Sequence, residues 1–296
     1  MTTFRTLMFV PGNQEKRIEK ARTVPADALI LDLEDSVPET EKGTARNIVS
    51  ASIQKLASEG LDIFVRVNSL STPHCTIDIK AVVKKGLKGI CLPKSESAND
   101  IHKAEAMIAE VEREIGIGEG SIGILALVET PKGIINAYQI AAASQRIIGI
   151  TFGAEDFSLE MGVNRTKEGY EIEYPRMAIA VACHAASVQA VDCVFTDVKD
   201  NEGLEAETKR IKQLGFQGKL VIHPDQVNPV NQIFTPSPEE IDHARKIVES
   251  FEKAVAQGSA SVSVDGKMVD SPVAARAKNL IVLAKLITKK SEQIIK

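Results

Sequence analysis

The sequence predicts an α/β protein, a (β/α)8 TIM barrel followed by a C-terminal helix–hairpin–helix extension. Three observations support this prediction. Eight short apolar segments of strand type occur in the first part of the chain, segments of helix type lie between them, and the pattern changes after residue 235. Eight strand–helix units in a row form a closed barrel, and a doubly wound open sheet is the alternative. We expect the barrel over residues 1–235 and the extension over residues 236–296.

The expected strands are runs of five to eight residues rich in Val, Ile and Leu. They are almost continuously apolar, which is typical of parallel strands that helices cover. They lie at Thr6–Pro11, Ala28–Asp35, Asp62–Asn68, Gly89–Lys94, Gly123–Glu129, Ile147–Phe152, Cys193–Val198 and Lys219–His223.

The segments between these strands show helical patterns. Residues 97–115 place apolar side chains three and four positions apart, as one buried face of a helix requires. Thr130 before Pro131 is a helix start, because Thr caps the first turn and Pro suits the first helical position. Residues 174–190 form a long Ala-rich segment that we expect to be a single helix.

The chain after residue 235 has a different pattern. Ser237 and the proline and two glutamates that follow it begin a helix, which we expect to end at Gly258. Asp265-Gly266 lies in an alternating segment and predicts a short hairpin. A final helix is expected over Pro272–Lys289. Such a segment is too small for its own core, so we expect it to pack on the barrel or on a neighbouring subunit.

Composition argues against several classes of protein. There are 36 basic and 40 acidic residues, and aromatic residues make up 4% of the chain with no Trp, so a nucleic-acid partner is not expected. No apolar stretch is long enough for a membrane span, and the N-terminal apolar run is too short for a signal peptide. The four Cys residues have no C-x-x-C spacing, so we expect reduced thiols without zinc. These features favour a cytoplasmic protein with no membrane partner.

Charged and polar residues gather where the expected strands end. In a (β/α)8 barrel the carboxyl ends of the strands form the active site, so these side chains are expected to converge. They are Asp32, Glu34, Asp35, Arg66, Asn68, Lys94, Glu129, Glu155, Asp156 and His223.

Glu129 and Asp156 follow neighbouring strands and are candidates to share a cation. Their hard oxygen ligands favour Mg²⁺, with Mn²⁺ as the alternative ion. The alternative for these carboxylates is an ion pair with Arg66 or Lys94. The planar guanidinium of Arg66 suits a carboxylate, so a metal beside it indicates a 2-oxo or 2-hydroxy acid as substrate.

Eight motifs in order from Leu7 to Val273 carry a family resemblance: LMFVPGN, LDLEDSV, FVRVN, LPK, LVETPKG, FGAEDF, LVIHP and GKMVDSPV. Together they resemble the citrate lyase β-subunit (CitE-like) family of the HpcH/HpaI aldolase and citrate lyase superfamily. The resemblance implies an oxo-acid lyase that cleaves a citryl-, citramalyl- or malyl-thioester into an oxo acid and an acyl thioester such as acetyl-CoA. Coenzyme A is then part of the substrate, unless an acyl-carrier protein presents it.

The resemblance also assigns roles to the residues at the ends of the expected strands. It implies that Glu129 and Asp156 bind Mg²⁺ next to the substrate, and that Arg66 binds the carboxylate of the oxo acid during catalysis. Glu34 and Asp35 are expected to hold water molecules of the metal.

The resemblance also implies which residues contact the thioester end of the substrate. Ile222 and His223 are expected to lie near the thioester. The turn of residues 9–13 and Arg17 are expected to line the path of the cofactor.

Asp270, in the MVDSP motif, matches an acid that relatives supply to the site of a neighbouring subunit. The resemblance therefore implies a homo-oligomer, a homotrimer or a hexamer, with Asp270 as general acid or base of a retro-Claisen cleavage. The alternative is that Asp270 only caps the last helix.

Other activities remain open at this point. They are a malate-synthase-like condensation with thioester hydrolysis, a CoA-free aldolase of hydroxy-oxo acids, and a β-subunit that is active only in its complex. The sequence selects neither the particular hydroxyacyl thioester nor the direction of the reaction.

Overall fold

A computed structural model describes residues 3–294 of the chain and divides it into two compact units. Phe4–Gln232 form the first unit, and the chain from Ile233 onward belongs to the second. This division lies a few residues before the boundary expected after residue 235.

The first unit is a closed barrel of parallel strands in the order β1 to β8, which confirms the predicted fold class. β1 pairs with β2 on one side and with β8 on the other, so that Leu7 lies opposite both Ala28 and Leu220. The strands are β1 (Thr6–Pro11), β2 (Ala28–Asp32), β3 (Ile63–Arg66), β4 (Leu87–Leu92), β5 (Gly123–Val128), β6 (Ile147–Phe152), β7 (Gln189–Asp192) and β8 (Gly218–Val221).

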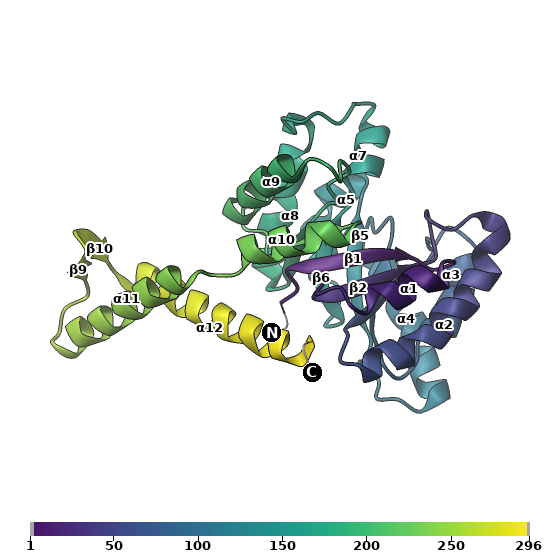
Figure 1. The fold of residues 1–296 in the computed structure, drawn as a ribbon, viewed down its shortest axis with the longest axis horizontal. Helices are drawn as coiled ribbons and strands as arrows, with labels where there is room; N and C mark the ends of the chain where they lie inside the picture. The colour runs from purple at the N-terminus through teal and green to yellow at the C-terminus, as the bar shows by residue number, and fades with distance from the viewer. Residues whose placement is uncertain (1–2, 295–296) are drawn as a thin grey trace. The chain divides into compact units, whose positions relative to one another are not determined.

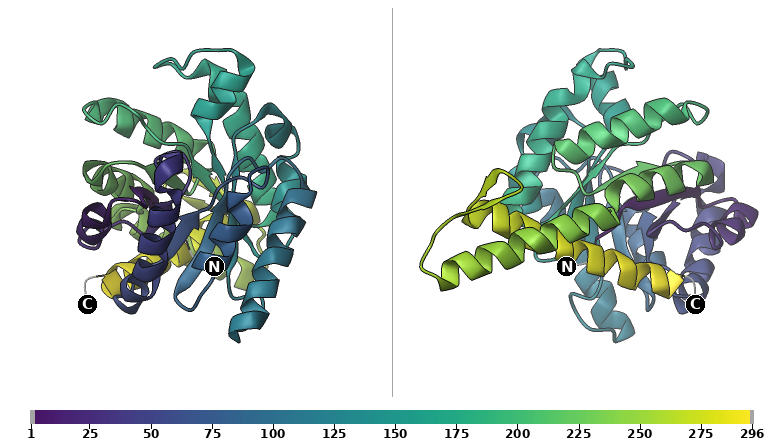
Figure 2. Two further views of the ribbon diagram at one scale, coloured as in Figure 1. Left: turned by 90° about the vertical axis from the view of Figure 1, so that its right-hand side faces the viewer. Right: turned by 60° about the vertical axis from the view of Figure 1, so that its left-hand side comes forward.

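Helices follow the strands and lie outside them (Figures 1 and 2). Thr130 caps its helix as expected, since its hydroxyl accepts a hydrogen bond from the Gly133 amide at 3.1 Å. The α-helices are α1 (Glu15–Ala21), α2 (Lys42–Ser58), α3 (His74–Val82), α4 (Ala98–Ile115), α5 (Pro131–Ile135), α6 (Ala137–Ala141), α7 (Ala154–Met161), α8 (Glu173–Ala186), α9 (Asn201–Gln213) and α10 (Val227–Phe234). Short 3-10 turns lie at η1 (Glu39–Glu41), η2 (Tyr170–Ile172) and η3 (Pro224–Gln226).

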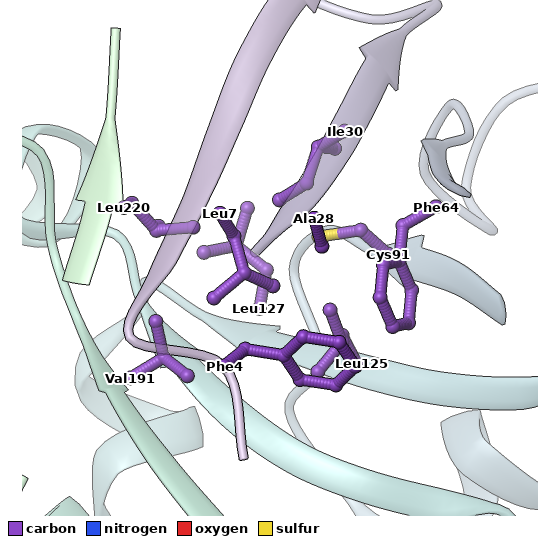
Figure 3. Packing of buried hydrophobic residues seen from close by; sticks show 10 residues of the cluster. All are labelled: Phe4, Leu7, Ala28, Ile30, Phe64, Cys91, Leu125, Leu127, Val191 and Leu220. Carbon is purple, nitrogen blue, oxygen red and sulfur yellow. The ribbon is translucent and has the colours of Figure 1, made fainter. Parts of the chain in front are cut away.

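Apolar side chains from seven of the eight strands fill the barrel interior, together with Phe4 just before β1 (Figure 3). The rings of Phe4 and Phe64 meet edge to face, with centroids 5.4 Å apart. The side-chain amide of Gln189 bonds both backbone groups of Phe4, accepting from its N–H at 3.1 Å and donating to its carbonyl at 2.6 Å. The interior is therefore a packed core that closes the end of the barrel opposite the rim.

The expected seventh strand, Cys193–Val198, is wrong. The helix expected over residues 174–190 is present, but it is shorter than expected. The helix ends at Ala186, where Ser187 has a left-handed φ of 59°, and β7 begins at Gln189. Gln189 and Asp192 make this strand polar in sequence. Both side chains are buried because they form hydrogen bonds with residues elsewhere in the chain. The segment is therefore not a continuous apolar run, which is the pattern that predicts the other strands.

Asp192 is part of a buried charge network behind the rim. Arg176 donates two hydrogen bonds to its carboxylate, at 2.8 and 2.9 Å, and Lys219 donates a third at 2.7 Å. Glu207 is the second acid and contacts both cations. Burial disfavours ionisation of Asp192, but Arg176 and Lys219 outweigh it and lower its pKa. Two acids and two cations balance, so this cluster needs no metal although Asp192, Cys193 and Glu207 lie close together.

The second unit contains α11 (Pro238–Ala256), the hairpin strands β9 (Val262–Val264) and β10 (Lys267–Val269), and α12 (Ser271–Ile294). Ser237 and Glu240 form a capping box at the start of α11, which confirms the expected helix start. The turn at Asp265-Gly266 has two positive φ angles, which confirms the hairpin. Val264, Val269 and Ala274 form a small core, so the expectation that the extension lacks a core is wrong.

The thiols of Cys75, Cys91, Cys183 and Cys193 are all free and buried, as the lack of Cys pairing motifs predicts. Burial raises the pKa of Cys91 to about 12, which makes its thiol a poor nucleophile. Among residues 3–294, no helix is both long and apolar enough to cross a bilayer.

The buried charge network predicts a large loss of stability in Asp192→Asn. The substitution leaves Arg176 and Lys219 with Glu207 as their remaining acid, and breaking a buried ion pair costs about 3–5 kcal/mol. Urea unfolding followed by circular dichroism measures this loss. Glu205→Gln, which breaks the exposed pair with Lys209, is the control and leaves the midpoint almost unchanged. Equal midpoints for the two variants would contradict the prediction.

Candidate active site

A pocket of about 410 Å³ lies at the carboxyl-terminal rim of the barrel. Its walls are apolar, and acidic and basic side chains project from strand ends and the loops that follow. The lining includes Phe9, Leu127, Phe152, Val194, Leu220 and Ile222 on the apolar side, and Arg17, Asp32, Asp35, Arg66, Glu129, Glu155 and Asp156 on the polar side. Six of the ten strand-end residues expected from the sequence therefore meet in one cavity, and Glu34, Asn68, Lys94 and His223 do not line it.

Arg66 is held at the end of β3 by Asp32, at the end of β2. Its Nε donates to Asp32 Oδ1 at 2.6 Å and its Nη2 donates to Oδ2 at 2.7 Å. The guanidinium carbon lies 4.7 Å from the ring centroid of Phe9, so a cation–π contact supports it. Burial disfavours the charge of Asp32, but the hydrogen bonds and charge of Arg66 outweigh this and lower the pKa of Asp32.

The outer edge of the Arg66 guanidinium has weaker partners. Its Nη1 lies 3.1 Å from Asp35 Oδ2 and 3.2 Å from Glu34 Oε2. Asp35 is mostly exposed, so this contact is easily exchanged. A substrate carboxylate can therefore bind at the outer edge, while Asp32 keeps the guanidinium in place.

Negative charge exceeds positive charge around Glu129. Burial, the charge of Asp156 and the charge of Glu34 raise the pKa of Glu129 to about 8. Burial also raises the pKa of Glu34 to about 7, although Arg66 acts in the opposite direction. The buried Oε2 atom of Glu34 accepts no hydrogen bond in the structure. A cation between these acids would relieve both the repulsion and the desolvation.

Backbone groups, and not side chains, position the Glu129 carboxylate. Its Oε1 accepts a hydrogen bond from the Lys94 amide at 2.8 Å, and Lys94 has a left-handed φ of 51°. On the other side lies Gly153, where an added Cβ would be 2.5 Å from Glu129 Cβ and 2.6 Å from Oε2. The glycine thus leaves the space in which the carboxylate sits.

The donor set at this point of the rim fits a hard divalent cation. Glu129 and Asp156 supply carboxylate oxygens, and among the described residues no sulfur or imidazole atom lines the pocket beside them except the buried thiol of Cys193. The charge of Arg66 lowers the pKa of Glu129, but burial and the neighbouring acids outweigh it. These properties suit Mg²⁺ or Mn²⁺ held by two carboxylates, with further positions left for water and substrate.

The structure places the other expected site residues in different surroundings. Ile222 and Arg17 line the pocket. The His223 ring does not line it. His223 Nδ1 accepts a hydrogen bond from the Asp225 amide at 3.2 Å and caps η3. Asp270 lies in the second unit, where its Oδ1 accepts from the Val273 amide at 3.3 Å at the start of α12.

Asn68 was expected at the rim but belongs to a structural network. Its side-chain amide donates to Asp78 at 2.6 Å, and its oxygen accepts from the Lys42 ammonium at 2.8 Å. The sequence showed Asp32 at a strand end but gave no sign that it clamps Arg66. It also gave no sign of the roles of Phe9 and Gly153, apart from their presence in the FVPGN and FGAEDF motifs.

The fold and the site together define a barrel enzyme whose pocket has acidic residues that suit a divalent cation and an arginine that suits a carboxylate. The family model described as HpcH/HpaI aldolase/citrate lyase matches residues 5–224. Citrate lyase subunit beta of Leuconostoc mesenteroides subsp. cremoris is 41% identical over 280 residues, covering 95% of this chain and 93% of that relative. The chain belongs to the HpcH/HpaI aldolase/citrate lyase family.

Two further comparisons extend this result. The (3S)-malyl-CoA thioesterase of Cereibacter sphaeroides is 31% identical over 284 residues, covering 96% of this chain and 95% of that protein. The crystal structure of CitE from Mycobacterium tuberculosis, in complex with magnesium, acetoacetate and coenzyme A, superposes with a TM-score of 0.78. It is 30% identical and covers 96% of this chain and 98% of that one.

Gly153→Ala should weaken metal binding, because the new Cβ would occupy the space of the Glu129 carboxylate. We expect affinity for Mn²⁺ to fall about 10–100-fold, the range seen when the support of a metal ligand is disturbed. Water-proton relaxation with Mn²⁺ measures this. The control is Gly43→Ala in α2, where an added Cβ meets nothing within 4 Å. Unchanged Mn²⁺ affinity in Gly153→Ala would show that the carboxylate does not bind the ion.

Proposed function

We propose that the protein is a Mg²⁺-dependent carbon–carbon lyase that cleaves a 3-hydroxyacyl thioester of coenzyme A into an oxo acid and an acyl thioester. The observation that carries this proposal is the meeting of Glu129, Asp156 and the clamped guanidinium of Arg66 in one pocket. The CitE structure holds magnesium, an oxo acid and coenzyme A together, which supports the same set of ligands here.

Arg66 binds and orients the carboxylate of the hydroxy-acid end through its outer edge, since Asp32 occupies the inner one. Glu129 and Asp156 are the residues that would hold Mg²⁺, and Glu34 and Asp35 would accept hydrogen bonds from water bound to it. A bound Mg²⁺ supplies Lewis-acid stabilisation of negative charge on the substrate oxygens.

The reaction is a retro-Claisen cleavage. A base removes the hydroxyl proton, the oxygen forms the carbonyl of the oxo acid, and the electrons of the broken C–C bond pass to the α-carbon of the thioester. A general acid then protonates that carbon. The apolar walls at Leu127, Val194 and Ile222 exclude water while this carbanion equivalent exists. Ile222 and the backbone at His223 lie at the end of β8, where we place the thioester.

Asp270 is the proposed general acid or base, supplied by a second copy of the chain in a homotrimer or hexamer. Its carboxylate is partly exposed and caps α12 through one oxygen, which leaves the other available. We place this assembly in the cytoplasm. An acyl-carrier protein is the proposed second partner if the substrate is carrier-bound.

A second candidate is condensation with hydrolysis of the thioester. The malyl-CoA thioesterase relative favours it, because hydrolysis at the same thioester requires only that water reach the carbonyl.

The test of the proposed function is release of acyl thioester from citramalyl-, malyl- and citryl-CoA, with Mg²⁺ and with EDTA. Cleavage of one of them to an oxo acid, abolished by EDTA and restored by Mg²⁺, is the expected result. Free coenzyme A without an oxo acid would identify hydrolysis instead. No product from any of the three would overturn the proposal for free coenzyme A esters and leave a carrier-bound substrate or a CoA-free aldolase.

Arg66→Lys should lower kcat/KM about 100-fold, because a lysine ammonium cannot bind Asp32 and a substrate carboxylate on two edges at once. Steady-state kinetics of the thioester that is cleaved measures the effect. Arg245→Lys, at an exposed ion pair with Asp242, is the matched control and should leave kcat/KM unchanged. Equal values for wild type and Arg66→Lys would remove Arg66 from the substrate site.

Asp270→Asn should lower kcat by about 10²–10⁴, the contribution of a positioned acid or base. Asp265→Asn, in the hairpin turn that precedes Asp270, is the control. Co-expression of Asp270→Asn with the inactive Glu129→Gln chain should restore activity, since mixed oligomers contain sites with both native residues. Full activity of Asp270→Asn alone, or no restoration in the mixture, would contradict a shared site.

A further inference from the structure

The loop that carries Glu34 and Asp35 is held by a buried cation that the proposed chemistry does not use. This cation is the ammonium of Lys42, at the start of α2. It donates to the Leu33 carbonyl, the Glu34 carbonyl and the Asn68 side-chain oxygen, each at 2.8 Å. An ammonium has three N–H donors, so all of them are used. Only 9% of Lys42 is exposed, and lysine is rarely buried to this extent unless specific partners receive it.

The partners of Lys42 are unusual for a buried cation. None of its three acceptors is a carboxylate, and among residues 3–294 no acid forms an ion pair with it. A charge taken out of water is normally offset by an opposite charge. Two of the acceptors here are main-chain oxygens of the loop that follows β2. The contacts therefore fix the backbone of this loop and do not neutralise a single acid.

Asp32 holds the same loop from its other backbone groups. Its Oδ1 accepts from the Glu34 amide at 2.9 Å, and its Oδ2 accepts from the Ser36 amide at 3.0 Å. Asp32 thus binds amides of the loop, and Lys42 binds its carbonyls. Because Asp32 also clamps Arg66, the loop and the guanidinium have fixed positions relative to each other.

Lys42 is itself fixed by groups outside the pocket. The side-chain amide of Asn68 donates to Asp78 Oδ2 at 2.6 Å and to the Leu33 carbonyl at 2.9 Å. Arg46, one turn further along α2, donates to Asp78 Oδ1 at 2.7 Å. Asp78 is fully buried in α3, which packs on α2. These contacts tie the ammonium, and with it the loop, to two helices.

Glu34 depends on this support. Its carboxylate is buried beside other acids, and burial raises its pKa to about 7. Its contact with Arg66, at 3.2 Å, involves one oxygen, and that oxygen accepts no hydrogen bond in the structure. The backbone of the loop therefore largely determines where the carboxylate points.

We propose that Lys42 is a positioning residue of the metal site, which sets the loop so that Glu34 faces the ion. The inference rests on the proposed function, because that function requires the ion. Lys42 does not line the pocket, so it acts through the two loop carbonyls and not through contact with substrate. Lysine suits this position because a single nitrogen atom donates in three directions.

Mn²⁺ affinity tests the inference without substrate, by water-proton relaxation of protein freed of metal with EDTA. Lys42→Met keeps an unbranched side chain but removes all three donors, so we expect the affinity to fall about 10–100-fold. Lys42→Gln keeps two N–H donors and should give a smaller loss, and it serves as the test variant if Lys42→Met does not fold.

Two controls separate positioning from a general loss of stability. Lys55→Met, in the same helix, breaks an exposed pair with Glu19 and should leave the Mn²⁺ affinity unchanged. Glu112→Gln weakens a buried pair with Arg146 before β5, at the end of the barrel away from the rim. It should lower the thermal unfolding temperature but leave the Mn²⁺ affinity unchanged.

A double-mutant cycle gives a reading that a purely structural role would not produce. If Lys42 acts through Glu34, Lys42→Met lowers Mn²⁺ affinity much less in the Glu34→Ala background than in wild type. Equal affinity in wild type and both Lys42 variants, equal losses in both backgrounds, a matching loss in Glu112→Gln, or a wild type that binds no Mn²⁺ would overturn the inference. The expected affinity changes in a protein that cleaves no thioester would instead count against the proposed function.

Discussion

Several carboxylates meet at the carboxyl-terminal rim of the barrel, and placing like charges together in a buried site is costly unless cations or hydrogen bonds accompany them. Parallel closure of the sheet makes this meeting unavoidable, because every strand ends at the same rim. The carboxylates at the rim differ in how far a neighbouring cation compensates their charge. Asp32 forms an ion pair with Arg66, whereas at Glu129 burial and the charges of Asp156 and Glu34 outweigh the charge of Arg66.

The contrast between two acidic clusters shows what this difference means. Asp192 and Glu207 lie with Arg176 and Lys219, so their charges cancel inside the protein and the cluster fixes β7 to β8. The charges around Glu129 do not cancel in this way, so an ion from solution would have to supply the missing positive charge. One cluster therefore stabilises the fold, and the other creates a binding site at the expense of fold stability.

Much of the fold followed from the sequence, because seven strands are apolar runs and the extension has strong helix and turn signals. β7 did not, because Gln189 and Asp192 become acceptable in a strand only through partners far away in the chain, at Phe4, Arg176 and Lys219. Local periodicity contains no information about such partners.

For the site, sequence reasoning located Arg66, Glu129 and Asp156, since residues at strand ends converge in any closed barrel. The clamp at Asp32 depends on side-chain geometry, and the support of Glu129 depends on the backbone at Lys94 and Gly153. Neither could be inferred from residue types. The same holds for Asp270, because the role that we propose for it requires a second chain.

The backbone support of Glu129 has a consequence for how this family can diversify. The Lys94 amide and the space left at Gly153 position the Glu129 carboxylate, so exchanges of the pocket walls at Leu127, Val194 or Ile222 should leave the geometry of the proposed ion site intact. Reaction chemistry and substrate choice are thus carried by separate parts of the chain and can change independently in evolution. Chains of this family with similar overall sequence can therefore process different acids, and the few wall positions are where their differences should be sought.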